Sequence, residues 1–439
     1  DNAPVIKEIQ ALRHERATML DYPHYSDYAM EGMMPEDVKT VHRFLEKVGE
    51  GALDKFSDTM GKISAYAKSQ DGPEKLEPWD VAYWGGKYKE EAFGFDAQKF
   101  SEYLPLEQSI DGFFNTAERI FGITFEERDD LPLYHPDVRT FEVKNTQTGE
   151  SHGFLYADMY AREGKTGGAW MSSLQSPEEG KPNIVTLNMN LMKPSEGQTA
   201  QLSLRDLETL FHEGGHAIHG LLGTDTRHPS LVGTASSSDY VEFFSTVLEN
   251  WPNQEACLKT FARHHKTGEA IPDELIQSWK DSSEFLSEAP ALKLVQNSLR
   301  DLLFHSSDPK EYTTSKAIED KADFDHPLAD HICAYPLQRW GHLFSSPQSG
   351  YASGYFGYLW SESLAKIGFK PFEKNGIYDP ETCENLASIY RKGGSWDQTK
   401  AYEAFHGGKV TPEEMADAVL ESIGASKRLT RNNAQTQSR

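Results

Sequence analysis

Hydrophobic residues recur at helical spacing through most of the chain, and one interval of alternating spacing interrupts them. Between Val38 and Ala52 the apolar positions step by three and four residues. The same spacing returns over residues 110–121, where Gly122 ends it. Steps of three and four place side chains on one face of an α-helix, so this pattern predicts amphipathic helices. We therefore expect residues 1–133 to form a helical lead-in.

Residues 134–191 have a different character, because apolar and polar positions alternate there. The segments 139–143 and 153–160 are rich in β-branched and aromatic residues, and a turn-like stretch separates them. The segments 167–171 and 184–189 resemble them. Alternation is typical of half-buried strands. The fold class is therefore predicted to be mainly α with one small β-sheet, followed by a helical bundle over 192–426 and a frayed tail over 427–439.

The helix predicted over residues 201–223 contains the motif His-Glu-Gly-Gly-His at 212–216. Ser203 followed by Asp206 predicts its N-terminal cap. Positions i and i+4 lie on one helix face, so His212 and His216 can bind a single metal ion. Glu213 can then reach a water on that ion without being a ligand. One interpretation is that the two central glycines leave room for substrate or for a neighbouring backbone. The alternative is that the helix simply tolerates two residues that disfavour helical structure.

Charge and apolar content exclude several classes of partner. The chain has 439 residues, with 44 Lys and Arg against 68 Asp and Glu, for a formal charge of −24. An acidic surface disfavours nucleic acids and anionic membranes as partners, and it modestly favours cationic peptides. No stretch approaches the roughly 18 consecutive apolar residues that a membrane-spanning helix needs. We expect no nucleic-acid partner and no membrane association.

The three cysteines, Cys257, Cys333 and Cys383, are widely separated and form no Cys-x-x-Cys pair. This usage suits a reducing compartment and disfavours a disulfide scaffold or a cysteine-based zinc site. Cytoplasm or an organelle matrix is therefore the expected location. The chain begins with Asp1 instead of Met. We expect a processed or truncated N-terminus, from which any targeting segment would be lost.

A catalytic zinc ion usually has three protein ligands, so a third is sought beyond His216. Metzincins need a glycine three residues and a histidine six residues after the second histidine of the motif. This chain has His219 and Leu222 at those positions, so that class is excluded. Zincins with a glutamate about 20 residues further on would need it near Ser236. The first glutamate after the motif is Glu242. It is therefore the candidate for the third ligand.

Glu242 falls in a second predicted helix over residues 239–251. Glu249 lies on the same helix face, because it follows Glu242 by seven residues. We expect Glu249 to accept a hydrogen bond from an imidazole N–H of a ligand histidine. Asp239 is a competing ligand, although its position favours capping this helix.

The two segments HEGGHAIHGLLG and DYVEFFSTVLENW together resemble the thimet oligopeptidase family, which includes oligopeptidase A and bacterial dipeptidyl carboxypeptidase. The resemblance extends to about residue 424, and further similar segments are LEPWDVAYW, HPDVRTFEV, YAREGKTGGAWM and GYASGYFGYLWSE. It implies a single metallopeptidase catalytic region with a zincin-type core, forming one side of a clam-shell helical channel. It also implies one zinc ion per chain, held by His212, His216 and Glu242.

A tyrosine-rich segment of this family bends over the zinc and grips the substrate. By this resemblance, Tyr358 would stabilise the oxyanion, assisted by Tyr355 or His342. Tyr351 would bind the substrate. Phenols suit this role, because they can donate to charge that appears only in the tetrahedral intermediate. Glu213 would act as the general base toward a zinc-bound water.

The predicted sheet offers a second contact with substrate. Metallopeptidases often hold an extended peptide along a strand edge, and Gly168 and Ala169 are the candidates here. The alternative is that the sheet only supports the motif helix.

The expected function is zinc-dependent hydrolysis of short unstructured peptides. A dipeptidyl carboxypeptidase and a non-catalytic, zinc-stabilised binding subunit are the alternatives. The resemblance begins well inside the longer family members, so the helical portion that walls one side of their channel is expected to be missing. A natural short form, a fragment and one half of a two-chain assembly all stay open. We hypothesise a partner chain that supplies the missing wall.

Overall fold

The computed structural model describes residues 2–177, 181–226, 228–344 and 351–425. The predicted tail at 427–439 lies outside them. The α-helices are α1 (Ala3–Met19), α2 (Tyr25–Ala29), α3 (Val38–Ser69), α4 (Asp80–Phe93), α5 (Ala97–Ser101), α6 (Leu106–Phe121), α7 (Leu204–Leu222), α8 (Val241–Thr246), α9 (Glu255–Phe261), α10 (Asp273–Ser282), α11 (Glu288–Ser306), α12 (Ser315–Ala322), α13 (Gly341–Phe344), α14 (Gly357–Asn375), α15 (Pro380–Lys392), α16 (Gln398–His406) and α17 (Pro412–Ser422). Short 3₁₀ turns occur at Pro229–Leu231, Leu248–Asn250, Ala329–Ile332 and Leu337–Arg339.

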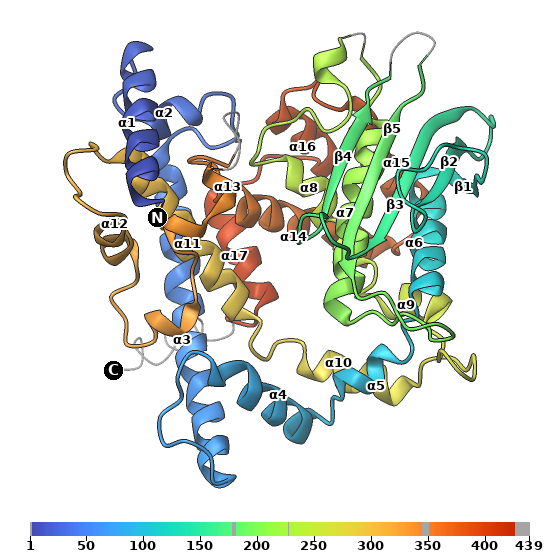
Figure 1. The fold of residues 1–439 in the computed structure, drawn as a ribbon, viewed down its shortest axis with the longest axis horizontal. Coiled ribbons are helices and arrows are strands. Elements are labelled where there is room, and N and C mark those ends of the chain that lie inside the picture. Colours follow the sequence, from blue (N-terminus) through green and yellow to red (C-terminus); the bar gives the residue numbers. More distant parts are fainter. Residues whose placement is uncertain (1, 178–180, 227, 345–350, 426–439) are drawn as a thin grey trace.

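One five-stranded sheet lies on one side of the molecule, in the order β1-β2-β3-β5-β4 (Figure 1). Its strands are β1 (Ile123–Glu127), β2 (Arg139–Asn145), β3 (Ser151–Tyr160), β4 (Trp170–Gln175) and β5 (Ile184–Leu191). Only β3 and β5 pair in parallel, and the other neighbours are antiparallel. β4 is therefore an edge strand, and its outer side pairs with no strand in the described part of the chain.

The strands predicted at 139–143, 153–160 and 184–189 are confirmed, and two expectations about the sheet are wrong. β1 falls within the predicted helical lead-in, where its five residues directly follow the helix that Gly122 ends, and so short an alternating run does not by itself predict a strand. The strand predicted over 167–171 begins only at Trp170. Gly168 has φ +94°, which lies outside the extended region of an L residue, so the backbone turns there before the strand starts.

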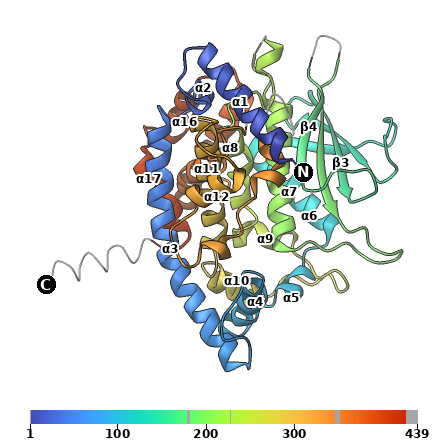
Figure 2. The ribbon, with the colours of Figure 1, turned by 60° about the vertical axis from the view of Figure 1, so that its left-hand side comes forward.

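The helices form two groups around the centre of the molecule. α3 packs against α11 and α17 in one group, while α6 and α7 pack against the sheet in the other. α8 contacts α7, and α14 contacts both α8 and α17, so these helices join the two groups (Figures 1 and 2). This arrangement confirms the mainly helical fold class with one small sheet. No helix in the described part of the chain is long and apolar enough to cross a membrane.

The motif helix α7 forms as its sequence predicts. Ser203 caps it by accepting a hydrogen bond from the Asp206 N–H, and the Asp206 side chain bonds back to the Ser203 N–H. The glycine at position 215 allows a close approach of α8, since an added Cβ would lie 2.6 Å from the Phe244 carbonyl oxygen. A neighbouring backbone therefore explains this mid-helix glycine.

Candidate metal and active site

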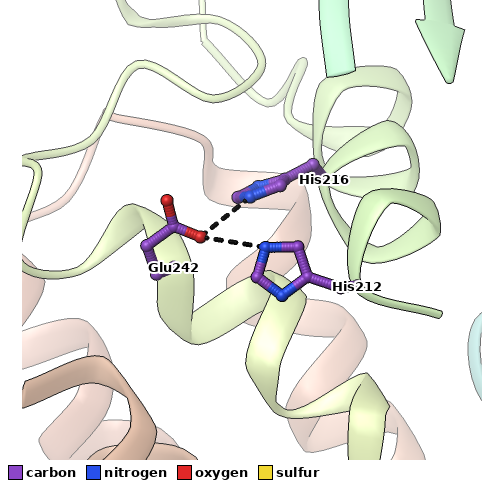
Figure 3. Close-up of side chains that lie close together, drawn as sticks. All are labelled: His212, His216 and Glu242. Carbon is purple, nitrogen blue, oxygen red and sulfur yellow. Dashed lines mark hydrogen bonds and ion pairs between the residues drawn. The ribbon is translucent and has the colours of Figure 1, made fainter. Parts of the chain in front are cut away.

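Three side chains from two neighbouring helices converge on one point (Figure 3). His212 and His216 project from successive turns of α7, and Glu242 comes from the first turn of α8. Glu242 Oε2 lies 3.2 Å from His212 Nε2 and 3.0 Å from His216 Nε2. The helical spacing of the histidines and the close crossing of α7 and α8 together produce this cluster.

The donor set of this cluster fits a zinc ion. Bonds of about 2.0–2.1 Å at tetrahedral angles separate neighbouring ligand atoms by roughly 3.3 Å. The distances of 3.0 and 3.2 Å between Glu242 and the two imidazoles are close to that value. Two imidazoles and one carboxylate also leave a fourth position for water or substrate.

Glu249 occupies the predicted position beside His212. Its Oε1 lies 2.6 Å from His212 Nδ1, on the opposite side of the ring from Glu242. A carboxylate can only accept at this distance, so it favours the tautomer with the proton on Nδ1. In the neutral imidazole, the form that ligates a metal, the lone pair of His212 Nε2 is then directed at the cluster.

Opposite charges dominate the electrostatics of the cluster. Burial alone would raise the pKa of Glu242, but the charges and hydrogen bonds of His216 and His212 outweigh it and hold that pKa well below its usual value. For His212, burial opposes protonation, yet the hydrogen bonds with Glu242 and Glu249 raise its pKa well above its usual value. Glu242 is thus held as a carboxylate, the form that ligates a metal.

Glu213 lies beside the cluster without joining it. Its side chain is buried, and Oε2 has no hydrogen-bond partner among the described residues. Burial raises its pKa above the ordinary value, and the charges of His212 and His216 oppose that shift. A buried carboxylate with an oxygen that has no hydrogen-bond partner, next to a possible metal site, is a candidate for proton transfer.

A cavity of about 230 Å³ adjoins the cluster. Glu213 and the three candidate ligands form part of its wall, and the other lining residues are Ala169, Trp170, Met171, Thr234, Val241, Tyr351 and Tyr358. The cavity therefore lies between α7, the edge strand β4 and the tyrosine-rich segment. A peptide in this cavity would be in contact with both the cluster and β4.

The residues that the sheet edge contributes to the cavity differ in part from those predicted. Ala169 lines the cavity as predicted, together with Trp170 and Met171, two residues that were not predicted to belong to the site. Gly168 instead presents its carbonyl oxygen to Asn190 Nδ2, at 2.7 Å. Side-chain pattern alone could not identify Trp170 and Met171, because the start of β4 decides which residues of the segment face the cavity.

The tyrosine-rich segment approaches the cluster from the other side. Tyr351 Oη donates a hydrogen bond to Glu242 Oε1 at 3.0 Å, and its ring stacks on Tyr358 with centroids 5.3 Å apart. Burial is the largest cause that raises the pKa of both phenols, so both remain hydrogen-bond donors at neutral pH. Two of the four predicted residues therefore face the cavity directly.

The other two predicted residues pack behind these tyrosines. Tyr355 is only 5% exposed, and its ring lies against Tyr358 and Trp340. His342 is within 5.5 Å of the Tyr351 and Tyr355 ring centroids, and burial lowers its pKa. The structure brings all four together, with Tyr355 and His342 outside the cavity wall formed by Tyr351 and Tyr358.

Asp239 does not cap α8, contrary to expectation. Tyr240 is the N-cap residue, and no side chain caps that helix end. Asp239 accepts hydrogen bonds from the Met34 N–H and the Ser237 hydroxyl. It is buried and is not part of the cluster of His212, His216 and Glu242.

Comparisons with known proteins identify the family of this chain. A sequence model of peptidase family M3 matches residues 1–421. Oligopeptidase A of Salmonella typhimurium is 32% identical over 97% of this chain and 62% of its own length. Dipeptidyl carboxypeptidase of Escherichia coli is 32% identical over 93% of this chain and 60% of its own length. The chain thus spans about three fifths of these relatives.

The fold is also similar to that of a solved structure. The structure of PZ peptidase A with an inhibitor matches 97% of this chain and 66% of that one, with a TM-score of 0.52 and 15% identity. At that identity the likeness concerns the fold alone. The family model covers nearly the entire chain, so this chain belongs to peptidase family M3.

Proposed function

We propose that this chain hydrolyses peptide bonds in short unstructured peptides, using one zinc ion held by His212, His216 and Glu242. The observation that carries the proposal is the convergence of these ligands beside a buried, unpartnered Glu213 oxygen. When bound, zinc supplies a Lewis acid that polarises a carbonyl and lowers the pKa of water toward about 7.

The residues around the cluster each have a defined task in this proposal. Glu213 Oε2 takes the proton from the attacking water and passes it to the leaving amine. Tyr358 Oη donates to the oxyanion of the tetrahedral intermediate. Tyr351 holds Glu242 through Oε1, which leaves Oε2 directed at the histidines.

The edge strand β4 would hold the substrate backbone. Its outer side has no partner strand among the residues that the structure describes, and Ala169, Trp170 and Met171 line the cavity where the strand begins. An extended peptide could add to this edge as a further strand. The scissile bond would then lie alongside the metal cluster.

The proposal is tested with a fluorogenic ten-residue peptide, with chelated protein and with protein to which one equivalent of zinc is returned. Hydrolysis that disappears on chelation and returns with zinc supports the proposal. A zinc-loaded chain that binds the peptide without cleaving it would instead support a non-catalytic binding subunit.

A dipeptidyl carboxypeptidase is the second candidate, because a relative of that name is as similar as oligopeptidase A. Mapping the cleavage sites on one peptide, with a free and with an amidated C-terminus, separates the two. Removal of C-terminal dipeptides from the free form alone indicates the carboxypeptidase. Internal cleavage of both forms indicates an oligopeptidase.

We also propose a reducing compartment and a partner chain. Cys257 and Cys383 are buried, and all three cysteines are free thiols. One relative is an organellar oligopeptidase A and another a probable cytosolic one. Intact mass and size-exclusion chromatography test the partner, and an active monomer of 49.4 kDa would refute it.

A further inference from the structure

A buried carboxylate outside the cavity holds the backbone of the tyrosine-rich segment. Asp301, on α11, is fully buried. Its Oδ1 accepts the Ser353 N–H at 2.9 Å, and its Oδ2 accepts the Tyr355 N–H at 3.0 Å. Both oxygens of one carboxylate thus bind the turn between Tyr351 and Tyr358.

This turn needs such support because of its backbone conformation. Ser353 has φ +61°, a left-handed conformation that an L residue other than asparagine or aspartate seldom adopts. The turn brings Tyr351 and Tyr358 into parallel stacking on the cavity wall. Without Asp301, two buried N–H groups would lose their acceptor, and the turn could relax.

Asp301 is itself part of a directed chain of hydrogen bonds. His305 Nδ1 lies 2.8 Å from Asp301 Oδ1, and His305 Nε2 lies 2.8 Å from Arg13 Nη1. A guanidinium can only donate, so His305 Nε2 must accept and its proton must reside on Nδ1. Arg13 on α1 therefore donates to His305, and His305 donates to Asp301.

Arg13 also binds the backbone next to His342. Its Nη2 donates to the carbonyl oxygen of Leu343 at 2.7 Å, directly after His342. α1 contacts α11, and Leu343 of α13 belongs to one hydrophobic cluster with Ile6 of α1 and Phe304 of α11. One cation of the first helix thus holds the backbone beside His342 and, through two buried residues, the backbone beside Tyr355.

We propose that Arg13, His305 and Asp301 are positioning residues that set the tyrosines at the metal cluster and couple helix α1 to the geometry of the site. The proposal rests on the proposed peptidase function. None of the three lines the cavity, so they act only through Tyr351 and Tyr358.

The first test measures the turn itself, independently of catalysis. Hydrogen–deuterium exchange of the peptide covering residues 351–358 is compared in the wild type, Asp301→Asn and Arg13→Gln. The amide of Asn has one acceptor oxygen in place of two, so we expect exchange to accelerate by about tenfold or more. Arg16→Gln is the matched control, since Arg16 lies on the same helix and bonds to the exposed Tyr28 hydroxyl. Unchanged exchange in both test variants would overturn the proposal.

The second test is a double-mutant cycle with Tyr358→Phe at saturating zinc, with bound zinc quantified. Alone, Asp301→Asn should lower kcat by about tenfold or more and change KM by less than about twofold. In the Tyr358→Phe background its further effect should fall below about twofold, because both changes remove the same donor. Additive losses would indicate general destabilisation and would overturn the proposal.

Arg13→Lys keeps the test decisive if Asp301→Asn does not fold. A lysine can donate to His305 or to Leu343 but cannot span both as a fork, so we expect activity and exchange between those of wild type and Arg13→Gln. If the wild type hydrolyses no peptide with zinc, the proposed function fails while the exchange measurement still decides the positioning role. If the wild type is active and the exchange is unchanged, only the positioning role fails.

Discussion

Glu249 Oε1 lies 2.6 Å from Nδ1 of His212, the nitrogen that points away from the metal cluster. Glu249→Ala removes this acceptor and frees the imidazole to adopt the other tautomer. We expect zinc affinity to fall by about 10–100-fold. Competition with a fluorescent chelator measures this affinity. The control is Glu255→Ala, at a half-buried glutamate on α9 whose ion pairs are with Lys259 and Lys280. Zinc affinity equal to that of the wild type would contradict this role.

Glu213→Gln tests the general base. The amide has almost the same volume but cannot take a proton, so turnover should fall by about 10²–10⁴-fold. Glu213 is not one of the clustered ligands, and zinc should therefore remain bound at one ion per chain. Peptide hydrolysis and metal analysis are measured on the same sample. Substantial residual cleavage with zinc bound would exclude Glu213 as the base.

Tyr358→Phe and Tyr355→Phe separate the two tyrosines. Removing one oxyanion donor typically lowers kcat by about 10²–10³-fold, and we expect this for Tyr358 because it lines the cavity. Tyr355 packs against Trp340 and is 5% exposed, so its hydroxyl should affect kcat by less than about tenfold. Steady-state kinetics give both values. A larger loss at Tyr355 would reverse the assignment.

Gly215→Ala tests the close crossing of α7 and α8. Alanine favours a helix by about 1 kcal/mol over glycine. Here its Cβ would lie 2.6 Å from the Phe244 oxygen and 2.8 Å from the Ser245 Cα, so the helices must separate. We expect a lower Tm and weaker zinc binding, since Glu242 moves with α8.

Gly61→Ala is the matched control for this substitution. Gly61 lies inside α3, and an added Cβ would meet nothing within 4 Å. It should raise stability by about 0.4–1 kcal/mol. Differential scanning calorimetry distinguishes the two variants, and equal Tm shifts would show that the crossing tolerates a methyl group.

His219 predicts a pH dependence of stability. It is fully buried, its ring stacks on Phe244, and burial lowers its pKa to about 3. The unfolded chain binds this proton below about pH 6.5. The free energy of unfolding should therefore decrease as pH falls from about 6.5 toward 3, by up to about 1.4 kcal/mol per pH unit.

His219→Leu should make this slope shallower, because leucine binds no proton in either state. Urea unfolding at pH 7 and pH 5 measures the difference, with chelator present so that metal release affects both proteins equally. Identical slopes in the two proteins would contradict the assigned pKa.

Local spacing accounts for the parts of the site that could be predicted. His212 and His216 share a helix face because they are four residues apart, and Ser203 with Asp206 caps that helix as expected. The helices α3, α6 and α7 and three of the strands follow from the period of their apolar residues. β1 and the start of β4 did not follow, because pairing with neighbouring strands, rather than local pattern, defines them.

Contacts between distant segments could not be predicted in this way. Asp239 had the sequence position of a cap, yet it binds the Met34 N–H, 205 residues away. The role of Asp301 could not be predicted from the sequence, because its partners Ser353 and Tyr355 are more than 50 residues further along the chain.

The sequence by itself determined the helix that carries both histidines and Glu213, because helical periodicity is a property of neighbouring residues. Only the tertiary structure decided that Tyr351 binds Glu242, 109 residues away, and that Tyr355 and His342 pack behind the cavity wall. Which side of a turn faces the metal cluster depends on the helices packed around it. Such packing is cooperative, and no short stretch of sequence encodes it.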